Sequence, residues 1–165
     1  VVMAGLGVGT YSGSFREVSP YRNKFTFNAD LGYGRWLDQT NGAYVRLSNL
    51  TAQRRGEHNQ SIHSLQAGYM LNVKSAITGE STESDVFQLT TLLGASMNVA
   101  TRSGHGPTYA PGLQAAVQAG VRVAPQVEIY LEPSVAAFGK TIERSHNSYP
   151  VEAMAKLSLG TKISF

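Results

Sequence analysis

The sequence predicts an all-β fold, an eight-stranded antiparallel up-and-down barrel, on three observations. Apolar side chains recur at every second position in eight separate segments, which is the period of a strand with one apolar face. The chain has 17 glycines, 8 tyrosines and 6 phenylalanines, whereas the helix formers Leu, Glu and Lys are sparse. No run of about 18 apolar residues is present to form a spanning helix. With 165 residues, the chain is expected to form one domain over 1–165.

The first four expected strands share this two-residue period. In the first strand the apolar residues alternate with glycines, and in the second they alternate with Lys, Thr, Asn, Asp and Gly. The second strand ends at the turn-rich stretch Asp38–Gly42, after which the third begins. The four strands are expected at Val2–Gly9, Lys24–Tyr33, Ala43–Leu47 and Leu65–Asn72.

The last four expected strands follow the same template. The sixth is the most regular, and Pro125 separates it from the seventh. Pro133 lies inside the seventh strand and is expected to mark a bulge, because a proline removes a ladder hydrogen bond. The eighth strand keeps its period as far as Phe165, which indicates that the sequence ends inside the sheet. These strands are expected at Phe87–Met97, Leu113–Val123, Val127–Val135 and Val151–Phe165.

Alternation alone fits two kinds of barrel, a membrane barrel with its apolar face outward and a soluble, lipocalin-like ligand-binding barrel with its apolar face inward. The polar phase holds many glycines, as expected where eight strands enclose a narrow lumen. The apolar phase of the eight segments carries no charge. On a lipid-facing surface an Arg or Lys costs about 2–4 kcal/mol at the bilayer midplane. These features favour an eight-stranded transmembrane β-barrel.

Charges of both signs occupy the polar phase and could pair inside a closed barrel: Lys24, Arg46, Arg122, Lys156 and Lys162 against Asp30, Glu128, Glu132 and Glu152. If strands six and seven form a hairpin, Arg122 stands opposite Glu128 and Gln118 opposite Glu132. Lys156 could then reach Glu132 from the eighth strand. We therefore expect a lumen ion-pair network made of Arg46, Arg122, Glu128, Glu132, Lys156 and Asp30.

Two motifs are more specific than the alternation: Val127–Pro133 reads VEIYLEP, and the chain ends in LSLGTKISF. With the eight segments, they resemble the small outer-membrane barrels of the OmpA and OmpX type, in particular those of Bacteroidota-like bacteria. The resemblance covers the whole chain and implies the outer membrane of a Gram-negative bacterium. It also implies a C-terminal signal for the outer-membrane assembly machinery, carried by Leu157, Leu159, Ile163 and Phe165.

With both termini in the periplasm, the long extracellular loops are expected at Ser12–Arg22, Ala52–Ser61, Thr101–Gly112 and Phe138–Pro150. Cations outnumber anions in these loops. The resulting basic rim could hold lipopolysaccharide phosphates, or it could be an ordinary solvated surface. The candidate residues for lipopolysaccharide contact are Arg22, Arg54, Arg55, Arg102, Lys140 and Arg144.

Two further features concern the ends of the barrel. The segment Val73–Asp85 is longer than a usual periplasmic turn, which indicates either a docking point for a partner or an ordinary loop. Aromatic residues are expected to form interfacial girdles, with Tyr11, Tyr21, Tyr109 and Tyr149 at the outer rim and Tyr33, Trp36, Phe87 and Phe165 at the inner rim.

No catalytic, cofactor or metal site is expected. The chain has no cysteine, and His58, His63, His105 and His146 lack the spaced partners of a metal site. Ser61 and His63 could share a face, but no carboxylate follows on that strand to orient the imidazole. The sequence thus indicates a structural, surface-contact or accessory subunit with a plugged lumen. The alternatives are a lipid A-modifying enzyme and a small gated pore. The expected partners are outer-membrane lipids and lipopolysaccharide, the assembly machinery and a larger outer-membrane complex, and no nucleic acid.

Overall fold

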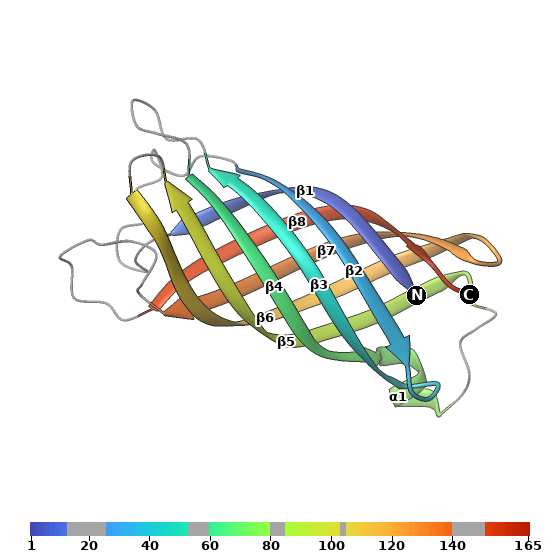
Figure 1. Cartoon of the computed structure of the whole chain (residues 1–165). Coiled ribbons are helices and arrows are strands. Elements are labelled where there is room, and N and C mark those ends of the chain that lie inside the picture. Colours follow the sequence, from blue (N-terminus) through green and yellow to red (C-terminus); the bar gives the residue numbers. More distant parts are fainter. Residues whose placement is uncertain (13–25, 53–59, 80–84, 103–104, 140–150) are drawn as a thin grey trace.

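The computed structural model describes residues 1–12, 26–52, 60–79, 85–102, 105–139 and 151–165. Within these ranges the chain forms eight strands and one short helix (Figure 1). The elements are β1 (Val2–Ser12), β2 (Thr26–Trp36), β3 (Asn41–Ala52), β4 (Gln60–Asn72), α1 (Val73–Thr78), β5 (Phe87–Arg102), β6 (His105–Ala124), β7 (Val127–Gly139) and β8 (Val151–Ile163). No helix in these ranges has the length and apolar character needed to cross a bilayer.

The strands form a closed antiparallel barrel in which each strand pairs with the next and β8 pairs with β1. Both chain termini and α1 lie at one end of the barrel, which we call the terminal end (Figure 1). Strand β1 runs from the terminal end to Ser12 at the other end of the barrel, and β2 runs back from Thr26. We call that other end the opposite end. The predicted eight-stranded up-and-down barrel is therefore confirmed.

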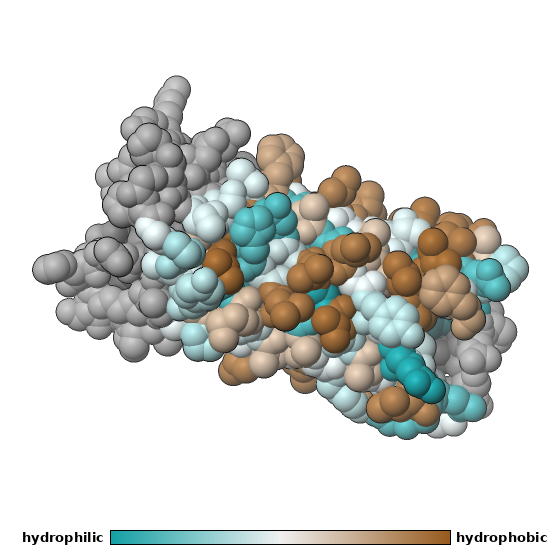
Figure 2. Space-filling view, viewed as in Figure 1, coloured by the Kyte–Doolittle hydropathy of each residue, from teal (hydrophilic) through white to brown (hydrophobic). Residues whose placement is uncertain are grey.

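Burial follows the two-residue period, so one face of each strand points inward and the other outward. Strand β7 alternates between buried and exposed residues over most of its length. The outer face carries large apolar side chains, which Figure 2 shows spread over the strands. Examples from every strand are Leu6, Leu31, Leu47, Leu65, Leu93, Leu113, Leu131 and Leu159. The apolar phase of the sequence is thus the outer face of the barrel.

The structure corrects several boundaries. Most of the predicted loop Thr101–Gly112 is strand, because β5 and β6 continue to Arg102 and from His105. Pro133 makes no bulge. It pairs with Leu157 in an unbroken β7–β8 register, since one missing donor removes a hydrogen bond without adding a residue. The register shift of β6–β7 lies instead between Arg122 and Ala124.

Strand β2 is also longer than expected, and its last residues change two predictions. Arg35 continues the outward phase and is exposed, so the outer face carries a charge at the terminal end. Trp36 belongs to the inward phase and packs against an interior apolar cluster. It therefore does not belong to the predicted inner-rim girdle, whereas Tyr33, Phe87 and Phe165 of that girdle and Tyr109 of the outer-rim girdle are exposed.

Candidate functional site

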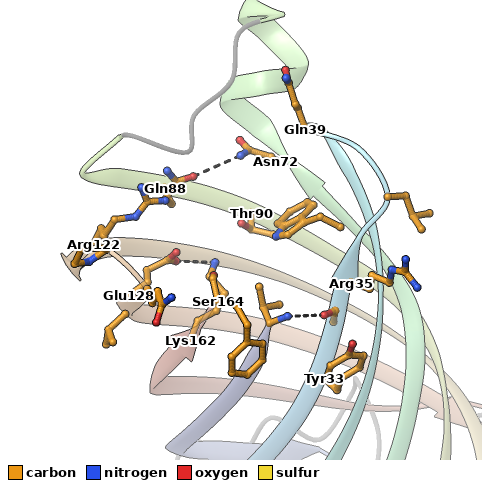
Figure 3. Close-up of a pocket in the computed structure, with 18 of the residues that line it drawn as sticks. Tyr33, Arg35, Gln39, Asn72, Gln88, Thr90, Arg122, Glu128, Lys162 and Ser164 are labelled. Carbon is orange, nitrogen blue, oxygen red and sulfur yellow. Dashed lines mark hydrogen bonds and ion pairs between the residues drawn. The ribbon is translucent and has the colours of Figure 1, made fainter.

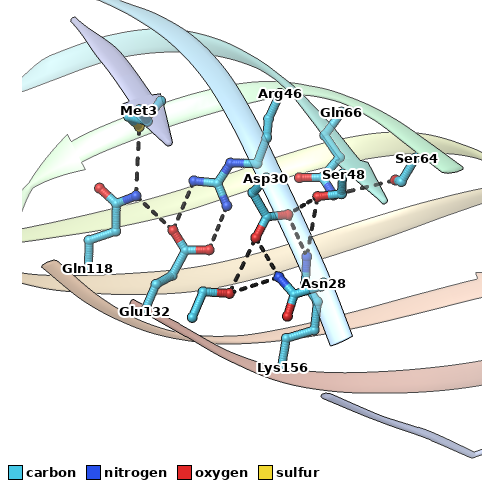
Figure 4. A network of polar contacts seen from close by, with 11 residues as sticks. Met3, Asn28, Asp30, Arg46, Ser48, Ser64, Gln66, Gln118, Glu132 and Lys156 are labelled. Carbon is cyan, nitrogen blue, oxygen red and sulfur yellow. Dashed lines mark hydrogen bonds and ion pairs between the residues drawn. The ribbon is translucent and has the colours of Figure 1, made fainter. Parts of the chain in front are cut away.

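The centre of the barrel interior is occupied by an ion pair between strands on opposite walls. Arg46 on β3 donates two hydrogen bonds to Glu132 on β7, from Nη1 to Oε1 at 2.5 Å and from Nη2 to Oε2 at 2.8 Å (Figure 4). The exposed fractions of the two side chains are 2% and 1%. Gln118 Nε2 donates to the same carboxylate at 2.7 Å. Such a two-pronged contact between planar groups fixes both position and orientation.

A second polar cluster joins β2 to β8 across β1. Lys156 Nζ lies 3.3 Å from Asp30 Oδ1, and Ser48 Oγ donates a hydrogen bond to the same carboxylate. Asn28 Nδ2 donates to Asp30 Oδ2 at 2.6 Å and to Ser158 Oγ at 3.0 Å. The Arg46–Glu132 pair and this cluster together form what we call the lumen network (Figure 4).

Glycines on β1 make this second cluster possible. A Cβ atom at Gly7 would lie 2.7 Å from Asn28 Oδ1 and 2.7 Å from Ser158 Cα, and one at Gly9 would lie 3.2 Å from Lys156 Cγ. Because β1 presents no side chains there, residues of β2 and β8 meet over its backbone. Lys156 of β8 can therefore pair with Asp30 of β2, and it does not reach Glu132, the partner that the sequence predicts.

The third interior ion pair lies nearer the terminal end. Lys162 Nζ on β8 is 2.7 Å from Glu128 Oε1 on β7, and both side chains are buried. Arg122 stands directly opposite Glu128 in the β6–β7 register, as expected. The carboxylate nevertheless pairs with Lys162 on its other neighbouring strand, and Arg122 is only half-buried. Arg122 thus belongs to the rim of the barrel and not to the lumen network.

Two apolar clusters flank the lumen network along the barrel axis. Strand β3 shows the order: Tyr44 lies toward the terminal end, Arg46 and Ser48 lie in the network, and Leu50 lies toward the opposite end. The cluster toward the terminal end contains Met3, Tyr44, Met70, Leu92 and Ala116. The cluster toward the opposite end contains Leu50, Ile62, Ala100, Ala110, Ala136, Phe138 and Met154.

Sequence reasoning missed both clusters. Their signal is an apolar residue in the otherwise polar phase, as at Met70 beside Leu71 or at Leu92 beside Leu93. The alternation assigned each strand one face and gave no weight to such doublets. The interior therefore consists of alternating apolar and ionic layers and not of ion pairs alone.

A cavity of about 830 Å³ opens at the terminal end (Figure 3). Its walls come from strands all around the barrel, and its polar lining includes Asn72, Gln88, Thr90, Arg122, Glu128 and Lys162. The Lys162–Glu128 pair lies in its wall (Figure 3). The cavity is therefore the mouth of the barrel interior at this end.

The opposite end is described only in part. Arg22, Arg54, Arg55, Lys140 and Arg144 lie outside the described residues, as does the side chain of Arg102, and so do His58 and His146. His63 is exposed on the outer face, whereas Ser64 is buried inside, so these neighbours cannot act together. No three His, Cys, Asp or Glu side chains gather as a metal site would require in the part of the chain that the structure describes.

The residues of the predicted C-terminal signal lie on or beyond β8. Leu157, Leu159 and Ile163 are exposed on the outer face, and Phe165 is the most exposed of the large apolar side chains among the described residues. Their outward orientation places them where a partner or lipid can contact them. The role of these residues in assembly stays a prediction.

In comparisons of sequence, no protein-family model and no curated protein matches the chain. Solved structures do match its fold. Neisserial surface protein A has a TM-score of 0.70 at 15% identity, covering 99% of this chain and 96% of that one. Ail, the attachment invasion locus protein of Yersinia pestis, has a TM-score of 0.54 at 12% identity, with 99% and 96% coverage. The N-terminal β-barrel domain of Pseudomonas aeruginosa OprF has a TM-score of 0.51 at 12% identity, with 97% and 95% coverage. The chain thus has the fold of the small eight-stranded outer-membrane barrels.

Proposed function

We propose that the chain is an integral protein of a bacterial outer membrane, with its termini toward the periplasm and a lumen closed to ions. Its role in this proposal is that of a structural, surface-contact or accessory subunit, without enzymatic activity. The apolar outer face supports the membrane location, since exposed apolar side chains occur on all eight described strands. The fold shared with three outer-membrane barrels supports the same location.

The proposal of a closed lumen rests on one observation, the Arg46–Glu132 ion pair at the centre of the barrel. The pair links opposite walls, and its two side chains are almost fully buried. An eight-stranded barrel has an interior just wide enough for side chains. The apolar clusters on either side of the network add to the packing of the interior around the pair.

The partners in this proposal follow from the surface. Outer-membrane lipids would contact the apolar outer face, and lipopolysaccharide would contact the predicted basic rim. The outer-membrane assembly machinery would recognise the C-terminal signal formed by Leu157, Leu159, Ile163 and Phe165. The names of two matched proteins, a surface protein and an attachment invasion locus protein, favour a contact role at the cell surface for this barrel as well.

Planar-bilayer recording tests the closed lumen. We expect no conductance steps from the purified chain, and we expect steps only when both charges of the central pair are removed in an Arg46→Ser/Glu132→Ser variant. Steps from the unmodified chain would favour the gated pore. A change in lipid A mass after expression in a Gram-negative host would favour the enzyme.

Two further measurements test the location and the accessory role. Membrane fractionation should place the chain in the outer membrane, and a soluble, monodisperse chain without detergent would contradict that location. Affinity purification from outer membranes should recover a stable assembly if the chain is an accessory subunit. Recovery of the chain alone would contradict that role and leave the structural one.

A further inference from the structure

Exposed apolar side chains form a collar at the terminal end of the barrel. They come from the β2–β3 turn, from α1, from the start of β5 and from the end of β6, which are neighbouring elements on one side of the barrel. Ile77 of α1 is 80% exposed and Leu37 of the turn is 70% exposed. The collar consists of Leu37, Ile77, Val86, Phe87, Val121 and Val123.

Helix α1 has a defined cap at each end and holds Ile77 in a fixed position in the collar. Asn72 caps the helix by accepting a hydrogen bond from the backbone N–H of Ser75, and Gly79 closes it in the left-handed conformation. Ser75 is buried, so the helix docks by one side and turns Ile77 away from the barrel. Lys74 on the helix pairs with Asp85 at 2.5 Å, which ties the segment back to the start of β5.

The β2–β3 turn lies beside α1. The backbone N–H of Asn72 donates to Thr40 O at 2.8 Å, and Figures 1 and 3 both show the turn next to the helix. On the outer face of β2 and β3 themselves, the terminal end carries the charged Arg35 and the polar Asn41. Ile77 and Leu37 therefore supply apolar surface on the side of the barrel where the strands end in polar residues.

We propose that α1 and the β2–β3 turn are interfacial anchors, whose Ile77 and Leu37 side chains insert into the lipid surface of the leaflet at the terminal end. This inference rests on the proposed membrane location and adds a site to it. Lys74 and Asp38 next to these apolar residues would stay at headgroup level, as charged neighbours of interfacial apolar residues do.

The distribution of the collar favours lipid over a protein partner. A partner protein covers one patch of about 800 Å² on each side of an interface, whereas a bilayer covers the whole circumference at one height. The collar itself lies on the side of the barrel formed by β2 to β6. On the remaining side, Ile129 of β7 and Ile163 and Phe165 at the end of β8 are also exposed at the terminal end, so apolar surface continues around the barrel there. The collar residues of β6 also continue the apolar outer face of that strand without a break, through Ala119 and Val117, and Phe87 of β5 is followed on the same face by Leu89.

Site-directed spin labelling tests the proposal, and the absence of cysteine makes single-cysteine variants straightforward. Ile77→Cys and Leu37→Cys would be labelled with a nitroxide and reconstituted in phosphatidylethanolamine/phosphatidylglycerol vesicles. Leu31→Cys, on the outer face of β2, serves as the lipid-facing control, and Gln126→Cys, in the exposed β6–β7 turn, as the aqueous one. The readout is the accessibility ratio of apolar oxygen to a water-soluble nickel chelate.

We expect ratios at Ile77 and Leu37 that lie above the ratio at Gln126 and below the ratio at Leu31. Ratios equal to that at Gln126, with a lipid-like ratio at Leu31, would overturn the anchor and leave the membrane barrel intact. A water-like ratio at Leu31 would overturn the proposed location itself. Labels at Ile77 shielded from both reagents would show that protein covers α1 and would also overturn the lipid anchor.

Discussion

Arg46 and Glu132 join opposite walls of the barrel through two parallel hydrogen bonds, although 86 residues separate them in the sequence. Both side chains are buried, so neither charge can be satisfied by bulk water if its partner is lost. Removing one partner of a buried ion pair leaves an uncompensated charge in a medium of low polarity. Substitution of one partner therefore tests whether this ion pair stabilises the folded barrel.

We expect Glu132→Gln to lower the free energy of unfolding by about 3–5 kcal/mol, because the Arg46 charge is left without its carboxylate. Urea titration of the detergent-solubilised barrel measures this change. Asp85→Asn is the matched control, since it removes a carboxylate from the exposed pair with Lys74 and should cost at most about 1 kcal/mol. Equal effects of the two substitutions would contradict a stabilising central pair.

The strands were predictable because their signal is local. A period of two needs only neighbouring residues, and β7 shows that period in its burial as clearly as in its sequence. Strand ends were predicted too short where polar residues or prolines continue the ladder, as at Pro107 and Pro111 of β6. Composition there is typical of a loop, while the hydrogen-bonded partner strand β5 keeps the segment extended.

The ion partners were not predictable in the same way. Arg122 and Glu128 face each other across a hairpin, and that register followed from the sequence. Glu128 nevertheless pairs with Lys162 and not with Arg122. Lys156 likewise pairs with Asp30 and not with Glu132. Both pairings depend on how the sheet closes into a barrel. Closure brings β8 beside β1 and lets side chains pass over the glycines of β1, which no single hairpin reveals.

A second prediction concerns the close packing of Tyr130 over Gly160. A Cβ atom at Gly160 would lie 2.4 Å from Tyr130 Cζ and 2.5 Å from Ala4 O. Gly160→Ala should therefore lower the free energy of unfolding by about 1–3 kcal/mol, the usual range for overpacking. At Gly139 the nearest atom to an added Cβ is 4.0 Å away, so Gly139→Ala should have little effect in the same urea titration. A smaller loss at Gly160 than at Gly139 would show that the Tyr130 ring has room to move.

A third prediction concerns the end of α1. Gly79 has φ of 72°, and its backbone N–H donates to Ser75 O at 2.9 Å. No heavy atom lies within 4 Å of an added Cβ, so the penalty for Gly79→Ala is conformational and should be about 1 kcal/mol. Amide hydrogen exchange should show faster exchange at α1 and unchanged protection in β4. Uniform loss of protection across the barrel would show that α1 is coupled to the whole fold.

The last prediction concerns Asp38 and pH. The Asn41 side chain donates to the carboxylate, and the backbone N–H groups of Thr40 and Asn41 donate at 2.7 and 2.6 Å. These hydrogen bonds, the one from the Asn41 side chain first, hold the pKa of Asp38 below its ordinary value of 3.8. Because the folded-state pKa is depressed, the stabilisation is present above pH 3.8 and is lost as the pH falls through the folded-state pKa.

Amide exchange at Thr40 and Asn41 should therefore be slow at neutral pH and should lose its protection in acid, after correction for the intrinsic rate. Asp38→Ala should remove this protection at every pH, whereas Asp85→Asn should leave it unchanged. The β2–β3 turn also presents Leu37 to the collar, so Asp38→Ala should loosen the turn without lowering the stability of the barrel measured by urea. Protection at Asn41 that does not change between neutral and acidic pH would contradict a role for the Asp38 charge and would show that the turn is held without it, for example by the hydrogen bonds that the backbone N–H groups of Leu37 and Asp38 donate to Asn41 O.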